Sequence, residues 1–178
     1  MIKPMLAHKF DIKRVDYSKP VYIQPKLDGV RCLFTKDGAF SRTGKQFKNL
    51  AHIELELIPF FKDNPNIILD GELYNHELKH DFEKIISLVR KQKPTADDRL
   101  DARNLIQYHV YDFISNDKAN YRDRMHELAC SDIYSDYIKY VQAYRVYKHE
   151  EALNMHHDAY LAKGYEGSIL RLDGIYKH

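Results

Sequence analysis

The chain has little cysteine, no tryptophan and no long apolar run. Its 178 residues include two cysteines, Cys32 and Cys130, which are too few for a zinc finger and give no sign of a disulfide scaffold. No apolar run approaches the roughly 18 residues that a membrane helix needs, and the first residues lack the pattern of a signal peptide. We therefore expect a protein of the reducing cytoplasm, without a membrane span.

A strong net charge is also absent. The sequence has 28 lysines and arginines against 26 acidic residues, which gives a net charge of +2. This balance excludes a strongly basic nucleic-acid-binding arm, although it allows a local basic groove. The ten histidines are scattered, and His156 and His157 fall in a helical pattern where we expect them to face solvent rather than to bind a metal.

Glycine is scarce, with seven residues, but its placement is informative. Asp-Gly turns and a helix end account for three of them. The other four lie inside clusters of charged residues, and these are Gly29, Gly44, Gly71 and Gly167. Glycine beside charge at a strand end lets the backbone approach a phosphate closely, so the clusters predict a phosphate-binding pocket.

The periodicity of the apolar residues predicts strands interleaved with helices. Asp37-Gly38 between alternating runs indicates a hairpin, and Asp81 is expected to cap a helix. Residues 91–104 contain Pro94 and many charges, and we expect a mobile loop there. The arrangement favours one α+β domain with mixed, largely antiparallel sheets packed with helices, rather than a doubly wound parallel sheet. The expected strands are 21–24, 30–36, 39–42, 67–73, 105–114 and 165–172, and the expected helices are 48–61, 82–89, 121–129 and 150–163.

The segment Lys26-Leu27-Asp28-Gly29-Val30-Arg31 is the strongest chemical signal in the chain. It follows a predicted strand, so the lysine lies at the mouth of that strand, on a tight connection. An amine held beside an arginine is suited to attack a phosphate. On these residues alone, a surface hairpin with a Lys-Asp pair remains an alternative.

Five segments occur in the order of the nucleotidyltransferase motifs of ATP-dependent DNA ligases. They read K-L-D-G-V-R at 26–31, S-R-T-G-K at 41–45, D-G-E-L at 70–73, Y-H-V-Y-D-F at 108–113 and E-G-S-I-L-R at 166–171. The opening Pro4-Met5-Leu6-Ala7 also resembles the start of such domains. The resemblance covers nearly the whole chain, and the compact start is similar to small phage-type ligases. It implies an ATP-grasp-like nucleotidyltransferase, or adenylation, domain over residues 1–178.

The resemblance implies that Lys26 is the catalytic nucleophile. It would attack the α-phosphate of ATP, form a lysyl-AMP intermediate and release pyrophosphate. Lysine amines are almost wholly protonated at neutral pH, and a nearby cation such as Arg31 or a bound divalent ion favours the neutral amine that this attack needs. ATP and Mg²⁺ are therefore the expected cofactors.

The resemblance gives roles to six further residues. Arg31 and Arg42 would hold the nucleotide or a 5′-phosphate, since forked donors suit phosphate. Glu72 would contact the ribose or support the metal, and Tyr111 would stack on adenine. Glu166 would bind Mg²⁺. Gln24 would lie near the adenine, at a position where family members often have glutamate. The resemblance therefore does not decide how the adenine base is recognised.

Each of these residues also has a structural interpretation. Tyr111 lies in an apolar strand and could belong to the core. Asp70 and Asp112 are expected to form hydrogen bonds that orient their neighbours rather than to bind metal. Cys32 is expected to be a small buried residue.

The lysine-rich motif that closes the family's domain does not occur before His178, nor does the oligonucleotide-binding barrel that follows it. We therefore expect residues 1–178 to be the adenylation domain alone, either a truncated piece or a naturally split product. The expected partners are ATP and nicked double-stranded DNA. A monomer without membrane contact is expected, in the cytoplasm, or in the host cytoplasm if a phage encodes the chain.

Several other functions stay open at this point. An mRNA-capping guanylyltransferase shares the lysine motif, an RNA ligase is a further alternative, and the chain could be a non-catalytic module that binds nucleotide or nicks. An NAD-dependent ligase is disfavoured because the 25 residues before Lys26 are too few for a nicotinamide-binding domain.

Overall fold

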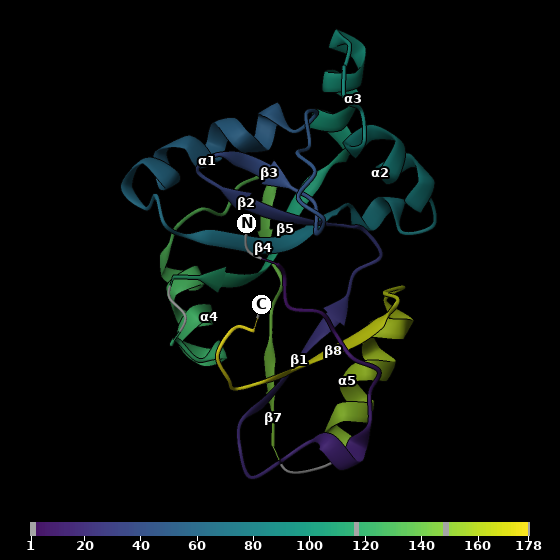
Figure 1. Ribbon diagram of the computed structural model, residues 1–178. Helices are drawn as coiled ribbons and strands as arrows, with labels where there is room; N and C mark the ends of the chain where they lie inside the picture. Colours follow the sequence, from purple (N-terminus) through teal and green to yellow (C-terminus); the bar gives the residue numbers. More distant parts are fainter. Residues whose placement is uncertain (1–2, 116–117, 148–149, 178) are drawn as a thin grey trace.

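Two β-sheets carry the fold of this computed structural model, which describes residues 3–115, 118–147 and 150–177 (Figure 1). The larger sheet has the strand order β3-β2-β4-β5-β6 and the smaller one β7-β1-β8. The strands are β1 (Val21–Lys26), β2 (Val30–Thr35), β3 (Gly38–Phe40), β4 (Ile68–Tyr74), β5 (Gln107–Ile114), β6 (Ile138–Tyr140), β7 (Tyr144–Val146) and β8 (Gly167–Leu172). All pairings are antiparallel except that of β5 with β6, so the α+β prediction is confirmed.

Helices cover both sheets. Figure 1 shows α1, α2 and α3 above the larger sheet, and α5 beside the smaller one. The α-helices are α1 (Ala51–Asp63), α2 (Phe82–Val89), α3 (Ala96–Leu105), α4 (Tyr121–Cys130) and α5 (Glu150–Ala162), with 3₁₀ turns η1 (Ile12–Arg14) and η2 (His76–Leu78). Four of the five α-helices were predicted within about three residues of these bounds, and Asp81 caps α2 as expected by accepting a hydrogen bond from the Lys84 N–H.

The main core lies between the larger sheet and its helices. Ile53, Leu57 and Phe61 form one buried stripe of α1, which matches the predicted helical period. Cys32 is fully buried in β2, as expected. A second, smaller cluster around Ile23 packs between the smaller sheet and α5.

Gly29 and Gly71 are required because any larger residue would collide with a neighbouring strand. This requirement is separate from the predicted approach of the backbone to a phosphate. A Cβ atom on Gly71 would lie 2.5 Å from the carbonyl oxygen of His109 and 2.7 Å from the ring of Tyr108, both on β5. On Gly29 it would lie 2.5 Å from the carbonyl oxygen of Leu73. The glycines therefore permit close packing against neighbouring strands.

The expectation of a loop over residues 91–104 is wrong, because α3 occupies Ala96–Leu105. Thr95 begins the helix with a capping box, in which its hydroxyl accepts from the Asp98 N–H and the Asp98 carboxylate accepts from the Thr95 N–H. The pattern Thr-x-x-Asp after Pro94 carried this start signal. The helix buries only Ala102, so it lacks the apolar stripe by which helices are recognised.

Two strands were not predicted. β6 and β7 have three residues each, and they lie in a tyrosine-rich stretch without regular alternation. Their pairing comes from neighbours distant in sequence, since β6 joins β5 in parallel and β7 joins β1. Such short strands are defined by tertiary contacts rather than by local pattern.

Arg124 on α4 is a buried charge that joins three parts of the chain. Its side chain is 1% exposed, and its Nε and Nη2 donate to the two carboxylate oxygens of Asp112 at 2.7 and 3.2 Å. Its Nη1 donates to the carbonyl oxygens of Ala119 and Gly174. The pair therefore fixes the C-terminal segment against the end of β5.

We predict that Arg124→Met lowers the free energy of unfolding by about 3–5 kcal/mol. The methionine leaves the fully buried Asp112 carboxylate with the Phe113 N–H at 2.9 Å and Arg171 at 3.8 Å, and an incompletely compensated buried charge is costly. Urea unfolding measures the change. The matched control is Arg122→Met, two residues earlier and exposed, which should stay within about 0.5 kcal/mol of the wild type. Equal stabilities of the two variants would contradict the prediction.

Candidate active site

Lys26 lies at the end of β1, as its sequence context predicts. β1 pairs with β8 so that Lys26 stands opposite Gly167, and the Glu166 N–H donates to the Lys26 carbonyl oxygen at 3.2 Å. This backbone pairing brings the two side chains together, and the Lys26 amine forms an ion pair with the Glu166 carboxylate. Their side chains are 42% and 45% exposed, so both groups are open to an incoming ligand.

Arg31 lies on β2, the next strand along the chain, which belongs to the larger sheet. It stands on β2 opposite Glu72 on β4, and its Nε and Nη2 donate to the two oxygens of Asp70 at 3.0 and 2.6 Å. The Asp70 carboxylate is fully buried, whereas 18% of the Arg31 side chain is exposed. Asp70 therefore orients the guanidinium as expected, and these bonds use two of its five N–H donors.

Tyr176 supports the Arg31–Asp70 pair from the other side. Its hydroxyl donates to Asp70 Oδ2 at 2.6 Å and accepts from the Met5 N–H at 2.9 Å. The N-terminal and C-terminal segments thus meet behind Arg31. No sequence signal marked Tyr176, because the contact spans 106 positions to Asp70 and 171 to Met5.

Glu72 and Tyr111 are neighbours in the larger sheet. The Tyr111 hydroxyl donates to Glu72 Oε2 at 3.3 Å, and its ring is faced by the guanidinium carbons of Arg171 at 5.0 Å and Arg31 at 5.7 Å. Burial raises the pKa of the Glu72 carboxyl to about 8, although Arg31 favours its charged form. Tyr111 is therefore part of a polar cluster with two arginines, and is not a plain core residue.

Gln24 is buried, and both ends of its amide are engaged. Its Nε2 donates to the Val141 carbonyl oxygen at 2.9 Å, and its Oε1 accepts from Arg171 Nε at 3.2 Å. Arg171 also lies 3.8 Å from Asp112. Asp112 therefore orients Arg171, and through it Gln24. Arg171 belongs to the E-G-S-I-L-R segment, so a sequence signal for it existed although the residue was not assigned a role.

Arg42 is the one predicted site residue that the structure leaves apart. It is exposed in the turn 41–45, which is closed by the Lys45 carbonyl oxygen accepting from the Ser41 N–H and which uses a positive φ of 85° at Gly44. Among the described residues its side chain has no hydrogen bond or ion pair. Phe40 pairs with Leu33, so the turn continues toward the end of β2 that carries Arg31.

The carboxylates suit a metal shared with a substrate. Within the described ranges, no group of three or more histidine, cysteine, aspartate or glutamate side chains is placed to hold an ion. Mg²⁺ is commonly bound by one or two carboxylates together with substrate phosphates and water. The exposed Glu166 fits that mode.

None of the helices described is long and apolar enough to cross a membrane.

Two sheets with mostly antiparallel pairings, and a lysine at the end of β1 that meets the Glu166 carboxylate just before β8, define a domain of the nucleotidyltransferase type. The chain belongs to the family of the ATP-dependent DNA ligase domain, whose model matches residues 4–178. Among curated proteins, no sequence matches the chain significantly.

Solved structures of DNA ligases share this fold. A structure from a study of Lig E DNA ligases, on DNA binding with a minimal scaffold, has a TM-score of 0.76 at 18% identity, covering 100% of this chain and 64% of that one. A Chlorella virus DNA ligase-adenylate has a TM-score of 0.74 at 23% identity, covering 98% of this chain and 61% of that one. The bacteriophage T7 ATP-dependent DNA ligase in complex with ATP has a TM-score of 0.74 at 17% identity, with coverages of 99% and 66%. The chain thus spans just over three fifths of the length of the first two structures.

We predict that Glu72 makes stability fall as pH rises. Its pKa is 4.5 in the reference state and about 8 in the fold, so the folded protein keeps a proton that the unfolded chain releases. The stabilisation is complete below pH 4.5 and is lost as pH rises through 8. Glu72→Gln should remove this decline, which is about 1 kcal/mol or more.

Urea titrations across this pH range measure the effect. The control is Glu83→Gln, which removes an exposed carboxylate from α2 and should keep the wild-type decline. The assignment to Glu72 is wrong if Glu72→Gln loses stability with pH as steeply as the control.

Proposed function

We propose that the chain is the adenylation domain of an ATP-dependent DNA ligase and that Lys26 becomes covalently linked to AMP. The observation that carries this proposal is the Lys26 amine, fixed at a strand end against Glu166, in a chain of this family. The amine nitrogen forms a bond to the α-phosphorus, the bond from that phosphorus to pyrophosphate breaks, and the nitrogen loses its proton.

In this proposal, Arg31 binds a phosphate of the substrate. Asp70, which also accepts a hydrogen bond from Tyr176, holds the guanidinium in one orientation, so little conformational entropy is lost when a phosphate binds. Preorganised positive charge is most effective where negative charge develops at the reacting phosphate. Arg42 would act later, on the 5′-phosphate of the DNA, which agrees with its exposed position outside the cluster.

The nucleoside would lie over Tyr111. Adenine would stack on the ring, and Glu72, which accepts from the Tyr111 hydroxyl, would contact the ribose. Gln24 is not free to read the base directly, because its amide already bonds to Val141 and Arg171. A direct contact of Gln24 with adenine requires one of these bonds to open.

Mg²⁺ would be held by Glu166 together with the phosphates of ATP, where it would neutralise charge on the leaving pyrophosphate. The ion pair of Lys26 with Glu166 must open before the amine can react, since a paired ammonium has no lone pair to donate. If Glu166 bonds to another group when the substrate arrives, the Lys26 amine is therefore released from the ion pair.

The partner in this proposal is nicked double-stranded DNA. AMP would pass from Lys26 to the 5′-phosphate at the nick, and a 3′-hydroxyl would then displace it to seal the strand. We further propose that the chain acts as a monomer. GTP in place of ATP as the adduct donor would indicate a capping guanylyltransferase instead.

We predict that Lys26→Ala abolishes the AMP adduct. Intact mass spectrometry of the purified chain, incubated with ATP and Mg²⁺, detects the adduct directly. Lys163→Ala serves as control, since it removes another exposed amine near the same sheet and should label like the wild type. An adduct that persists in Lys26→Ala would show that Lys26 is not the nucleophile. If the wild type forms no adduct with either ATP or GTP, the chain is instead a non-catalytic module that binds nucleotide.

We predict that Glu166→Gln slows adduct formation more than about tenfold while the thermal transition shifts by only a few degrees. The exposed carboxylate contributes little to packing, so its loss affects chemistry and not folding. Glu151→Gln, on the exposed first turn of α5, should change neither quantity. A large drop in the transition temperature of Glu166→Gln would instead assign it a structural role.

A further inference from the structure

Glu166 lies in a short segment, residues 163–166, which joins α5 to β8 of the smaller sheet and which we call the corner. All four backbone N–H groups of the corner donate hydrogen bonds, three of them to carbonyl oxygens of α5 and that of Glu166 to Lys26. Arg31 and Glu72, by contrast, lie on the larger sheet. The placement of Glu166 relative to these two residues therefore depends on contacts that join the corner to the larger sheet.

His76 makes such a contact. It lies in η2, directly after β4 of the larger sheet, and its Nε2 donates to the Lys163 carbonyl oxygen at 3.0 Å. A carbonyl oxygen can only accept, so Nε2 carries the hydrogen, and Nδ1 of the neutral ring accepts from the Tyr74 hydroxyl at 2.8 Å. The imidazole also packs on the ring of Tyr165, with the two centroids 4.5 Å apart. One side chain thus bonds to β4 and contacts two residues of the corner.

The larger sheet holds His76 in place. Tyr74 is 1% exposed and belongs to the main core. Asn75 accepts from the Glu77 N–H and donates from Nδ2 to the Leu105 carbonyl oxygen at 3.0 Å, which ties the η2 turn to the end of α3. The imidazole is therefore oriented by the larger sheet and presents its Nε2 to the corner.

Lys79, at the end of the same turn, also packs on the corner. A Cβ atom on Gly164 would lie 2.8 Å from Cε and 2.9 Å from Cδ of Lys79. The aliphatic part of the Lys79 side chain therefore covers the backbone of Gly164, which has a positive φ of 85°. Residues 76–79 and the corner thus meet through a hydrogen bond, a ring contact and an aliphatic contact.

We propose that His76 is a positioning residue for Glu166. It fixes the corner to the larger sheet, and so it sets where the Glu166 carboxylate lies relative to Lys26 and Arg31. This inference rests on the proposed function, in which that carboxylate leaves Lys26 and holds Mg²⁺ together with the phosphates of ATP. The exchange of partners needs a backbone that stays in place, since a displacement of about 1 Å can slow a reaction about a hundredfold.

The test uses three substitutions that divide the contacts of the imidazole. His76→Gln places an amide nitrogen where Nε2 lies, so it keeps the donor to the Lys163 carbonyl oxygen. His76→Asn offers an amide oxygen to the Tyr74 hydroxyl but does not reach the corner. His76→Phe keeps the ring contact with Tyr165 and loses both hydrogen bonds.

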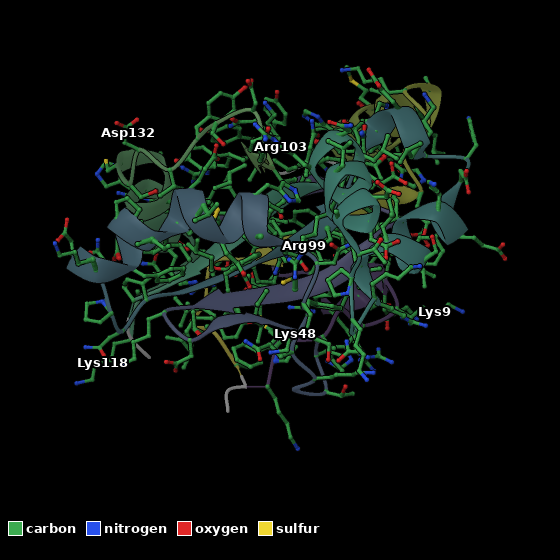
Figure 2. The ribbon with its side chains drawn as sticks, turned by 90° about the horizontal axis from the view of Figure 1, so that it is seen from above. Lys9, Lys48, Arg99, Arg103, Lys118 and Asp132 are labelled. Atoms are coloured by element: carbon green, nitrogen blue, oxygen red, sulfur yellow. The ribbon has the colours of Figure 1, made fainter. Side chains whose placement is uncertain are left out.

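The matched control removes one hydrogen bond of similar length far from the corner. Arg103→Met loses the bond from Arg103 Nε to the Tyr137 hydroxyl, which is 2.9 Å long. Figure 2 shows Arg103 among the helices above the larger sheet, whereas α5 and the corner belong to the smaller one. Hydrogen–deuterium exchange of residues 163–166 is measured without ATP. Adduct formation is measured over ranges of ATP and Mg²⁺ concentration.

In His76→Asn and His76→Phe, the amides of the corner should exchange about fivefold faster or more, because a hydrogen bond that holds the corner is lost. Both variants should form the AMP adduct about tenfold more slowly and need more Mg²⁺ for half of the maximal rate. The ATP concentration that gives half of the maximal rate should stay within about twofold, since Arg31 and Tyr111 do not touch the corner. His76→Gln should stay within about threefold of the wild type in exchange and rate, and the control should match the wild type.

Two results would overturn the role of His76. One is equal behaviour of His76→Gln and His76→Asn, and the other is faster exchange of the corner without slower adduct formation. If instead the wild type forms no adduct while the corner exchanges as expected in every variant, the proposed function fails and the contact between the sheets stands.

Discussion

The buried carboxylate of Asp70 is the constraint on which the site depends. It is fully removed from water, so its charge must be compensated by partners inside the protein. Arg31 provides two donors and Tyr176 a third, while the Met5 amide bonds to the tyrosine hydroxyl. The Asp70 charge thus fixes the orientation of Arg31, and through Tyr176 it holds the segments that contain Met5 and Tyr176 against the same pair.

Asp112 performs a parallel task at the other side of the cluster. Arg124 compensates its charge from α4, and Arg171 approaches it from β8. Arg171 in turn bonds to Gln24, which stands two residues before Lys26 on β1. Removal of either aspartate would free an arginine on one side of the site, so stability and the geometry of the site are coupled through these two carboxylates.

Lys26 and Glu166 differ from these buried pairs because water reaches both of them. An exposed ion pair has a small net energy, about 0–1 kcal/mol, and can exchange partners without a large penalty. The site therefore combines arginines that are held in place with a nucleophile that can be released.

The sequence by itself determined the order of strands and helices around the motifs, the hairpin at Asp37-Gly38 and the position of Lys26 at a strand end, because turn chemistry and apolar period are local. It also indicated Glu166 and Arg31 through short segments. Only the tertiary structure decided that Glu166 meets Lys26, that Tyr176 and Met5 support Arg31, and that His76 bonds to Lys163. These contacts depend on the pairing of β1 with β8 and on hydrogen bonds between distant segments, for which no local pattern exists. The short strands β6 and β7 escaped prediction for the same reason, since they have little apolar pattern of their own. The helix α3 differs, because it has a local start signal at Thr95 but buries only Ala102 and so lacks an apolar stripe.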